Sequence, residues 1–273
     1  MSETSDVPAT AHKLKLAQCE VVRYEDEFGH SYEIDGQPVV GVTTILGMGV
    51  PPEPGLVEWW KRNGKGEQED VLLDAQERGS NVHAAIERLL YGESVSPAEF
   101  SRPREKKAIA AFLDFARTIQ LDPATVKPEQ VVAFVNGDVR FAGTLDLVFE
   151  SNGKKYVLDF KTSATPSKKN SLQVQAYKAA FEQSHPDERI DACYVLYLGT
   201  NHAGTRSVKD KNGLPTTGAG WSLQTSTDGF DDFLRAYDMA IWCNGGKYPE
   251  PPKVAAYPEV WRLFEKVKVK EKQ

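Results

Sequence analysis

The sequence is poor in residues that cross-link a chain or anchor it in a membrane. Only three cysteines, Cys19, Cys193 and Cys243, occur in 273 residues, and they are far apart, without a CxxC pair. This spacing argues against a disulfide framework or a zinc knuckle and is typical of reduced thiols. No apolar run reaches the length of a membrane span, and the polar, acidic first residues contain no secretory signal. We therefore expect a cytoplasmic protein without a membrane partner.

The chain also lacks an overall positive charge. Its formal net charge of −6 at pH 7 gives no reason to expect a polyanionic partner for the protein as a whole. Local charge differs, because four lysines and no acid lie between Lys161 and Lys178. A second basic cluster lies at 102–107, close to acidic residues that offset part of its charge, and a third lies at 266–272. A solvated surface is the simpler interpretation of the last cluster.

The succession of apolar patterns predicts an α/β fold in which a central mixed sheet is flanked by helices. We expect a disordered tail over 1–12 and an N-terminal hairpin and helical region over 13–128. The sheet core is expected over 129–200. A loop and C-terminal helices, packed on the core as one domain, are expected over 201–273.

Periodicity places the elements within these regions. Helical spacing of apolar residues predicts helices over 71–91, 106–119, 171–182, 230–242 and 259–268. Gly79 is expected to divide the first of these, with Ser80 capping its second half. β-prone runs predict a hairpin within 19–40 and strands over 131–135, 139–149, 156–161 and 191–198. Residues 201–220 are expected to form a loop or a loose hairpin.

A tight turn between two of these strands brings carboxylates together. Asn152-Gly153 is a strong signal for a two-residue type I′ hairpin turn. If these two residues form the loop, Asp146 faces Asp159 directly, with Cβ atoms roughly 4.5–5.5 Å apart. Strand alternation puts Lys161 on the same face as Asp159.

Two opposed carboxylates among apolar residues repel each other unless a cation neutralises them. Mg²⁺ or Mn²⁺ is the simple answer, because both favour carboxylate oxygens. Lys161 would then supply positive charge for phosphate chemistry. The alternative is that both aspartates are solvated on an exposed sheet face, with Lys161 as a surface ion pair.

Short motifs around this hairpin resemble a known superfamily. GTLD at 143–146, followed by DFK at 159–161, resembles the GxxD…(D/E)xK signature of the PD-(D/E)XK nucleases. RGSNVH at 78–83 and QVQAY at 173–177 look like the RGxxxH and QxxxY motifs of the RecB-like, Cas4-like exonuclease branch. VTTIL at 42–46 and GLVEWW at 55–60 look like phage-encoded members. The resemblance implies a restriction-endonuclease-like core with an N-terminal helical extension.

The resemblance also implies roles for individual residues. It makes Asp146, Asp159 and Lys161 catalytic. The metal ligands that it implies are His83, Asp146, Asp159 and the backbone carbonyl of Phe160. Supporting or DNA-binding roles would belong to Gln173, Tyr177, Glu129, Lys168 and Lys169. In the implied mechanism the metal activates a water that attacks the scissile phosphate, and Lys161 offsets the developing charge. A histidine ligand would bias the site toward Mn²⁺ over Mg²⁺.

These expectations lead to a metal-dependent DNA exonuclease of phage-type recombination, replication or repair. Three ungrouped cysteines predict no iron–sulfur cluster, in contrast to the Cas4 proteins of the branch. One alternative is an endonuclease that acts on branched or flapped DNA. Another is a non-catalytic DNA-binding subunit, which the retained lysine and carboxylates argue against. DNA is the expected partner, and a single-strand-annealing or replication protein is a further candidate. Oligomeric state stays open.

Overall fold

A five-stranded mixed sheet forms the centre of the protein. The structure is a computed structural model that describes residues 10–26, 29–163, 166–203 and 207–247. The sheet has the order β5-β6-β7-β8-β9. All neighbours in it are antiparallel except β7 and β8, which are parallel. Its strands are β5 (Lys127–Asn136), β6 (Val139–Ser151), β7 (Lys154–Lys161), β8 (Ala192–Ala203) and β9 (Thr217–Thr225).

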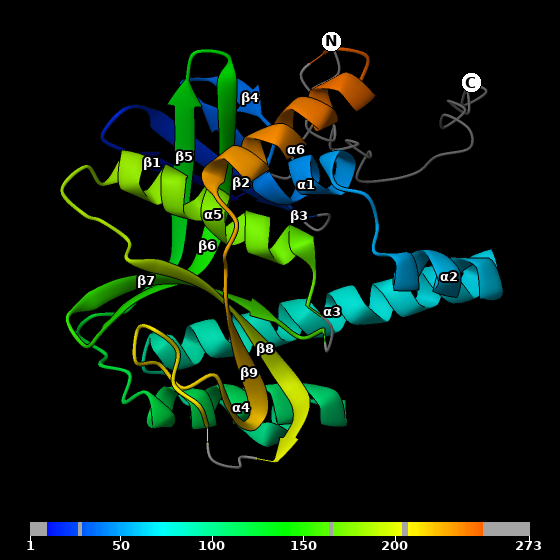
Figure 1. Cartoon of the computed structure of the whole chain (residues 1–273), viewed down its shortest axis with the longest axis vertical. Helices are drawn as coiled ribbons and strands as arrows, with labels where there is room; N and C mark the ends of the chain where they lie inside the picture. Colours follow the sequence, from blue (N-terminus) through cyan, green and yellow to red (C-terminus); the bar gives the residue numbers. More distant parts are fainter. Residues whose placement is uncertain (1–9, 27–28, 164–165, 204–206, 248–273) are drawn as a thin grey trace, which may run out of the picture.

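Helices cover both faces of this sheet (Figure 1). One face packs against α3 (Lys65–Leu90) and α4 (Pro103–Thr118). The other packs against α1 (Val42–Gly49), α5 (Lys168–Ser184) and α6 (Phe230–Cys243). Because β7 and β8 are parallel, their connection must cross the sheet, and α5 forms it. The predicted α/β architecture is therefore confirmed.

A second, antiparallel sheet lies at the N-terminal end. Its four strands pair in chain order. They are β1 (Thr10–Lys15), β2 (Glu20–Asp26), β3 (Gly29–Ile34) and β4 (Gln37–Val39). Val21 and Ile34 pack with Ala133 and Ala142 of the central sheet, and these side chains are buried. This sheet thus extends the hydrophobic core past β5 and β6.

Two short helices complete the described elements, α2 (Pro54–Arg62) and the 3₁₀ turn Pro97–Glu99. Proline lies in the first turn of both, where its missing N–H leaves no hydrogen bond unmade. None of the described helices is long and apolar enough to cross a membrane.

Several element predictions need correction. Residues 10–12, expected in a disordered tail, belong to β1, which pairs with β2 along its whole length. The expected core boundary at 129 falls inside β5, which begins at Lys127. Gly79 does not divide a helix, because α3 continues through it. A glycine costs a helix only about 1 kcal/mol, and burial of Val82, Ala85 and Ile86 on the sheet outweighs that. The predicted helix over 259–268 lies outside the described residues.

Candidate metal centre

The turn between β6 and β7 has the predicted form. Asn152 and Gly153 have φ angles of 54° and 70°, as a type I′ turn requires. The register runs from Ser151 opposite Lys154 to Leu147 opposite Leu158. The paired stretch therefore ends one residue short of Asp146 and Asp159, on the predicted register.

Beyond the paired stretch, the side chains of Asp146 and His83 form hydrogen bonds with the backbone of Phe160 in β7. The N–H of Phe160 donates to Oδ2 of Asp146 at 2.6 Å. The carbonyl oxygen of Phe160 lies 3.0 Å from Nε2 of His83. The backbone of Phe160 thus fixes both side chains, and its ring packs edge-on against the rings of Phe112 and His83. The predicted neighbours His83, Asp146 and the Phe160 carbonyl are together in the structure.

Glu129 approaches Asp146 from the next strand. The pairs Pro128–Leu147 and Gln130–Leu145 flank the two residues on β5 and β6. Glu129 has a φ of 47°, a left-handed conformation that is costly for a residue with a Cβ. Such strain is found where surrounding structure imposes it, often at functional sites. The sequence did not predict this left-handed backbone conformation.

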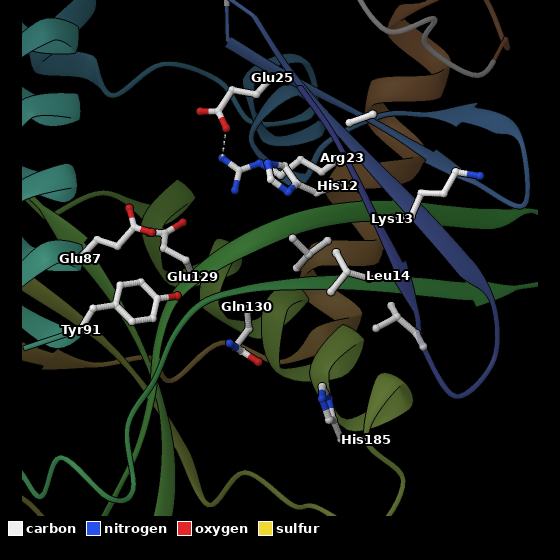
Figure 2. A pocket seen from close by; sticks show the side chains of 13 residues that line it. His12, Lys13, Leu14, Arg23, Glu25, Glu87, Tyr91, Glu129, Gln130 and His185 are labelled. Atoms are coloured by element: carbon white, nitrogen blue, oxygen red, sulfur yellow. Dashed lines mark ion pairs between the residues drawn. The ribbon is translucent and has the colours of Figure 1, made fainter. Parts of the chain in front are cut away.

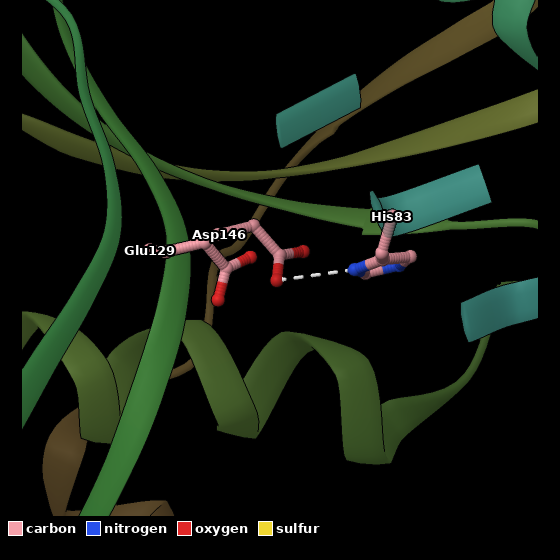
Figure 3. A group of neighbouring side chains, drawn as sticks. All are labelled: His83, Glu129 and Asp146. Atoms are coloured by element: carbon pink, nitrogen blue, oxygen red, sulfur yellow. Dashed lines mark ion pairs between the residues drawn. The ribbon is translucent and has the colours of Figure 1, made fainter. Parts of the chain in front are cut away.

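Three side chains from three elements therefore converge. One donor atom each of His83 (α3), Glu129 (β5) and Asp146 (β6) lies within 4.8 Å of the other two. Figure 3 shows the two carboxylates side by side, with the His83 ring directed at Asp146. Nδ1 of His83 lies 3.3 Å from Oδ1 of Asp146. We call this group the metal triad.

The electrostatics of the metal triad favour a cation. Burial raises the pKa of Glu129 to about 7, and the neighbouring Asp146 charge adds to this rise. Burial alone would lower the pKa of His83, but the charge and hydrogen bond of Asp146 raise it to about 9. Burial likewise opposes ionisation of Asp146, yet His83 and Lys161 lower its pKa. A protonated imidazole therefore neutralises Asp146. Once the imidazole is deprotonated, the nitrogen and oxygen donors fit a divalent ion of the Mg²⁺ or Mn²⁺ type.

Asp159 and Lys161 form a buried ion pair beside the metal triad. Nζ of Lys161 lies 2.7 Å from Oδ2 of Asp159, whose side chain is 2% exposed. Burial raises the pKa of Asp159 to about 6, although the Lys161 charge opposes the rise. Burial alone would lower the pKa of Lys161, but Asp159 and Asp146 raise it overall. Lys161 is therefore held as a cation next to the carboxylates. The solvated sheet face considered as an alternative does not describe this pair.

The GxxD and QxxxY motifs meet in the core. Nε2 of Gln173 donates to the hydroxyl of Tyr177 at 3.0 Å, and both side chains are buried. The Tyr177 ring lies against Gly143, where a Cβ atom would come within 2.6 Å of Cε1. Because Gly143 has no side chain, the ring of Tyr177 can pack directly against this strand. Burial raises the pKa of the Tyr177 hydroxyl, and the Asp159 charge adds to this.

The two lysines predicted as phosphate contacts have different surroundings. Lys168 is exposed and forms an ion pair with Asp228, and its backbone N–H donates to Oε1 of Glu53 at 3.2 Å. Lys169 is half-buried in the first turn of α5, where its N–H donates to the Ser167 hydroxyl. Their role in DNA binding stays a prediction. Lys168 could contact a phosphate only if the phosphate replaced Asp228 as its ion-pair partner.

Comparison with known proteins agrees with this geometry. The sequence profile of the PD-(D/E)XK nuclease superfamily matches residues 57–241, well over half of the chain and including every residue of the site. The chain therefore belongs to the PD-(D/E)XK nuclease superfamily. Membership implies a hydrolytic nuclease that uses a divalent metal and acts on DNA. The match identifies the superfamily and does not distinguish its RecB-like branch or its phage-encoded members.

Two further comparisons add little. No curated protein matches the chain. Among solved structures, one described as the crystal structure of SSO0001 is similar, with 13% sequence identity and a TM-score of 0.36. The match covers 75% of this chain and 75% of that one.

Proposed function

We propose that this chain is a metal-dependent DNA exonuclease, with Asp146, Asp159 and Lys161 as its catalytic residues. The observation that carries the proposal is the position of the metal triad directly beside the Asp159–Lys161 ion pair. A superfamily member that had lost its chemistry would not need to keep two like charges buried next to each other. A non-catalytic DNA-binding subunit is therefore the weaker alternative.

His83, Glu129 and Asp146 would hold the ion, with Asp159 and the Phe160 carbonyl as further candidate ligands. Bound there, the metal would act as a Lewis acid on the scissile phosphate and make a water more acidic. The imidazole in the donor set favours Mn²⁺ over Mg²⁺. Loading the site requires His83 to give up a proton, because a protonated imidazole has no lone pair to donate.

The remaining residues act through charge and position. Lys161 presents its ammonium group where negative charge develops on the phosphate, and Asp159 fixes that ammonium at 2.7 Å. Tyr177 and Gln173 pack behind the GxxD strand and keep Asp146 in register with β7.

The exonuclease mode is supported by the RGxxxH and QxxxY motifs, which resemble the largely exonucleolytic RecB-like branch. A role in phage-type recombination, replication or repair in a cytoplasm follows from the same resemblance, with a single-strand-annealing or replication protein as candidate partner. Structure-specific endonuclease action is the second candidate, because the same residues would serve it.

The test compares linear and closed circular DNA. Both substrates, end-labelled where linear, are incubated with the protein and Mn²⁺. The variants are Asp146→Asn and Lys161→Ala, and the matched controls are Asp138→Asn and Lys106→Ala, which change exposed residues of the same types. We expect loss of linear DNA only, abolished by the first two variants and unchanged in the controls.

Other outcomes would change the proposal in defined ways. Nicking of circles would replace the exonuclease by the endonuclease. Absence of Mn²⁺-dependent cleavage of any substrate, single-stranded DNA included, would refute a catalytic function. Full cleavage activity of Asp146→Asn would show that the reaction takes place at another site.

A further inference from the structure

A basic cleft lies beside the nuclease site, at the end of β7. It has a volume of about 340 Å³ and is lined by residues of α3, α4 and the ends of two strands. The lining residues that matter here are Arg78, Arg104, Lys107, Thr162 and Asn201. Three are cations, and no carboxylate of the described residues lines the cleft. In a protein of net charge −6, this is a local field that favours an anion.

The cations of the cleft are available to a ligand. Arg104 and Lys107 are exposed and form no ion pair with any of the described residues. Arg78 keeps one contact, from Nη1 to Asp74 at 2.9 Å, while its Nε is buried without a hydrogen-bond partner among the residues that the structure describes. Arg102, by contrast, does not line the cleft and forms ion pairs with Glu77, Glu105 and Asp74, the carboxylate that also contacts Arg78. Within the basic cluster of the sequence, Arg102 is therefore neutralised by carboxylates, whereas Arg104 and Lys107 form no ion pair with the described residues.

The cleft adjoins the nuclease site through two elements. Arg78 precedes His83 by five residues on α3, a distance of about 7.5 Å along the helix axis. Thr162 follows Lys161 directly and lies against Gly79, where a Cβ atom would be 3.9 Å from its hydroxyl oxygen. The cleft is therefore close enough to the metal triad for one DNA strand to reach both.

The opposite flank of the site has a different character. A cavity of about 620 Å³ there includes Glu129 itself and mixes cations with carboxylates. Figure 2 shows Glu87 and Glu129 close together near Tyr91, while Arg23 is engaged by Glu25. This flank is unsuited to a second phosphate. The two flanks therefore give the site a direction along α3.

We propose that the basic cleft binds a phosphate group of the DNA strand being cleaved, either a terminal phosphate or a backbone phosphate close to the scissile bond. Arg104 and Arg78 offer planar guanidinium groups that match phosphate oxygens, and Lys107 adds a point charge. The hydroxyl of Thr162 and the amide of Asn201 complete a set of hydrogen-bond donors. This inference rests on the proposed nuclease function, because it assigns the neighbour of the scissile phosphate.

The test measures binding and cleavage separately. Binding of fluorescent oligonucleotides is followed by anisotropy in EDTA, where cleavage cannot occur. The strands carry a phosphate at the 5′ end, at the 3′ end or at neither end. Arg104→Ala and Lys107→Ala are compared with Lys106→Ala, which removes an exposed lysine of the same helix that does not line the cleft. Thermal unfolding verifies that the variants fold.

We expect each cleft variant to raise Kd about tenfold, as removal of one charged hydrogen bond does. For each phosphate interaction that a variant removes, the slope of log Kd against log salt should fall by about 0.9 on duplex DNA and about 0.7 on single strands. Lys106→Ala should leave both quantities unchanged. If removal of one terminal phosphate has the same effect as the variants, and the variants no longer respond to it, the cleft holds that end. An equal weakening on all strands identifies a backbone phosphate.

Parent-like Kd values and salt slopes for Arg104→Ala and Lys107→Ala would overturn the cleft assignment. Absence of DNA binding by the parent would do the same. Cleavage with Mn²⁺ is scored separately, so a parent that cleaves while the cleft variants bind normally refutes only the cleft. A parent that binds through the cleft but never cleaves refutes the nuclease proposal alone.

Discussion

Replacement of Gly143 by alanine tests how the site is supported. An added Cβ atom would lie 2.6 Å from Cε1 of Tyr177 and 3.5 Å from Cδ1 and Cζ of the same ring. The ring is 4% exposed and its hydroxyl is held by Gln173, so it has little room to move. Overpacking costs about 1–3 kcal/mol, and an approach of 2.6 Å belongs to the upper part of that range, at about 2–3 kcal/mol; the usual gain of replacing glycine in a strand, about 0.5–1 kcal/mol, must be subtracted. We expect Gly143→Ala to lower the free energy of unfolding by about 1–2 kcal/mol.

The assay is equilibrium unfolding in urea, combined with the rate of Mn²⁺-dependent DNA cleavage. Tyr177→Leu removes the ring, so Gly143→Ala should cost nothing in that background, and the double-mutant cycle isolates the contact. Gly47→Ala is the control, because nothing lies within 4 Å of a Cβ at that exposed helical position and the change should stabilise the protein. Cleavage should fall about a hundredfold or less, as a displacement near 1 Å does. A Gly143→Ala protein as stable as its parent would refute the reasoning.

Three further predictions concern the metal triad, an ion-pair network and the packing of α4. At a hundredfold excess over Kd, Mn²⁺ should raise the free energy of unfolding by about 2.7 kcal/mol, and Glu129→Gln should remove most of this increase. If urea unfolding shows the same increase for the variant as for the parent, Glu129 is excluded as a ligand. Burial alone would raise the pKa of Glu188, but two lysines lower it to about 2. Because the folded pKa lies below the ordinary value of 4.5, this stabilisation is present above pH 4.5 and is lost as the pH falls toward 2. Glu188→Gln should therefore cost about 1 kcal/mol at pH 7 and nothing near pH 2, and a constant difference in unfolding free energy would contradict this. Asp114→Ala should cost about 2 kcal/mol, because Oδ2 of Asp114 accepts from Nε1 of the buried Trp221 at 2.8 Å; an unchanged thermal midpoint would count against it.

Much of the fold could be predicted because local signals were strong. Asn152-Gly153 determined a turn type, and the turn determined the register of β6 against β7. Elements without such signals were missed. β1 has the sequence TAHKLK, and β9 contains Gly218 and Gly220, so neither shows a clear apolar alternation. Both are strands because a neighbouring strand offers hydrogen bonds, which a single sequence does not reveal.

The candidate site was predictable in its members but less so in its grouping. Motif spacing brought His83, Asp146, Asp159 and Lys161 to attention. The resemblance named Glu129 only as a supporting or DNA-binding residue, because its place in the metal triad depends on a left-handed φ that a sequence does not reveal. Likewise, only the three-dimensional arrangement separates Arg104 and Lys107, which line the basic cleft, from Arg102, which does not.

The two hydrogen bonds of Phe160 give this nuclease a built-in reporter. Its amide proton is held by a carboxylate at 2.6 Å, a charge-assisted bond that should shift the proton resonance strongly downfield. Any ion that draws the Asp146 oxygens toward itself weakens that bond and moves the resonance. A metal titration can therefore be followed at a single backbone amide, without DNA and without turnover.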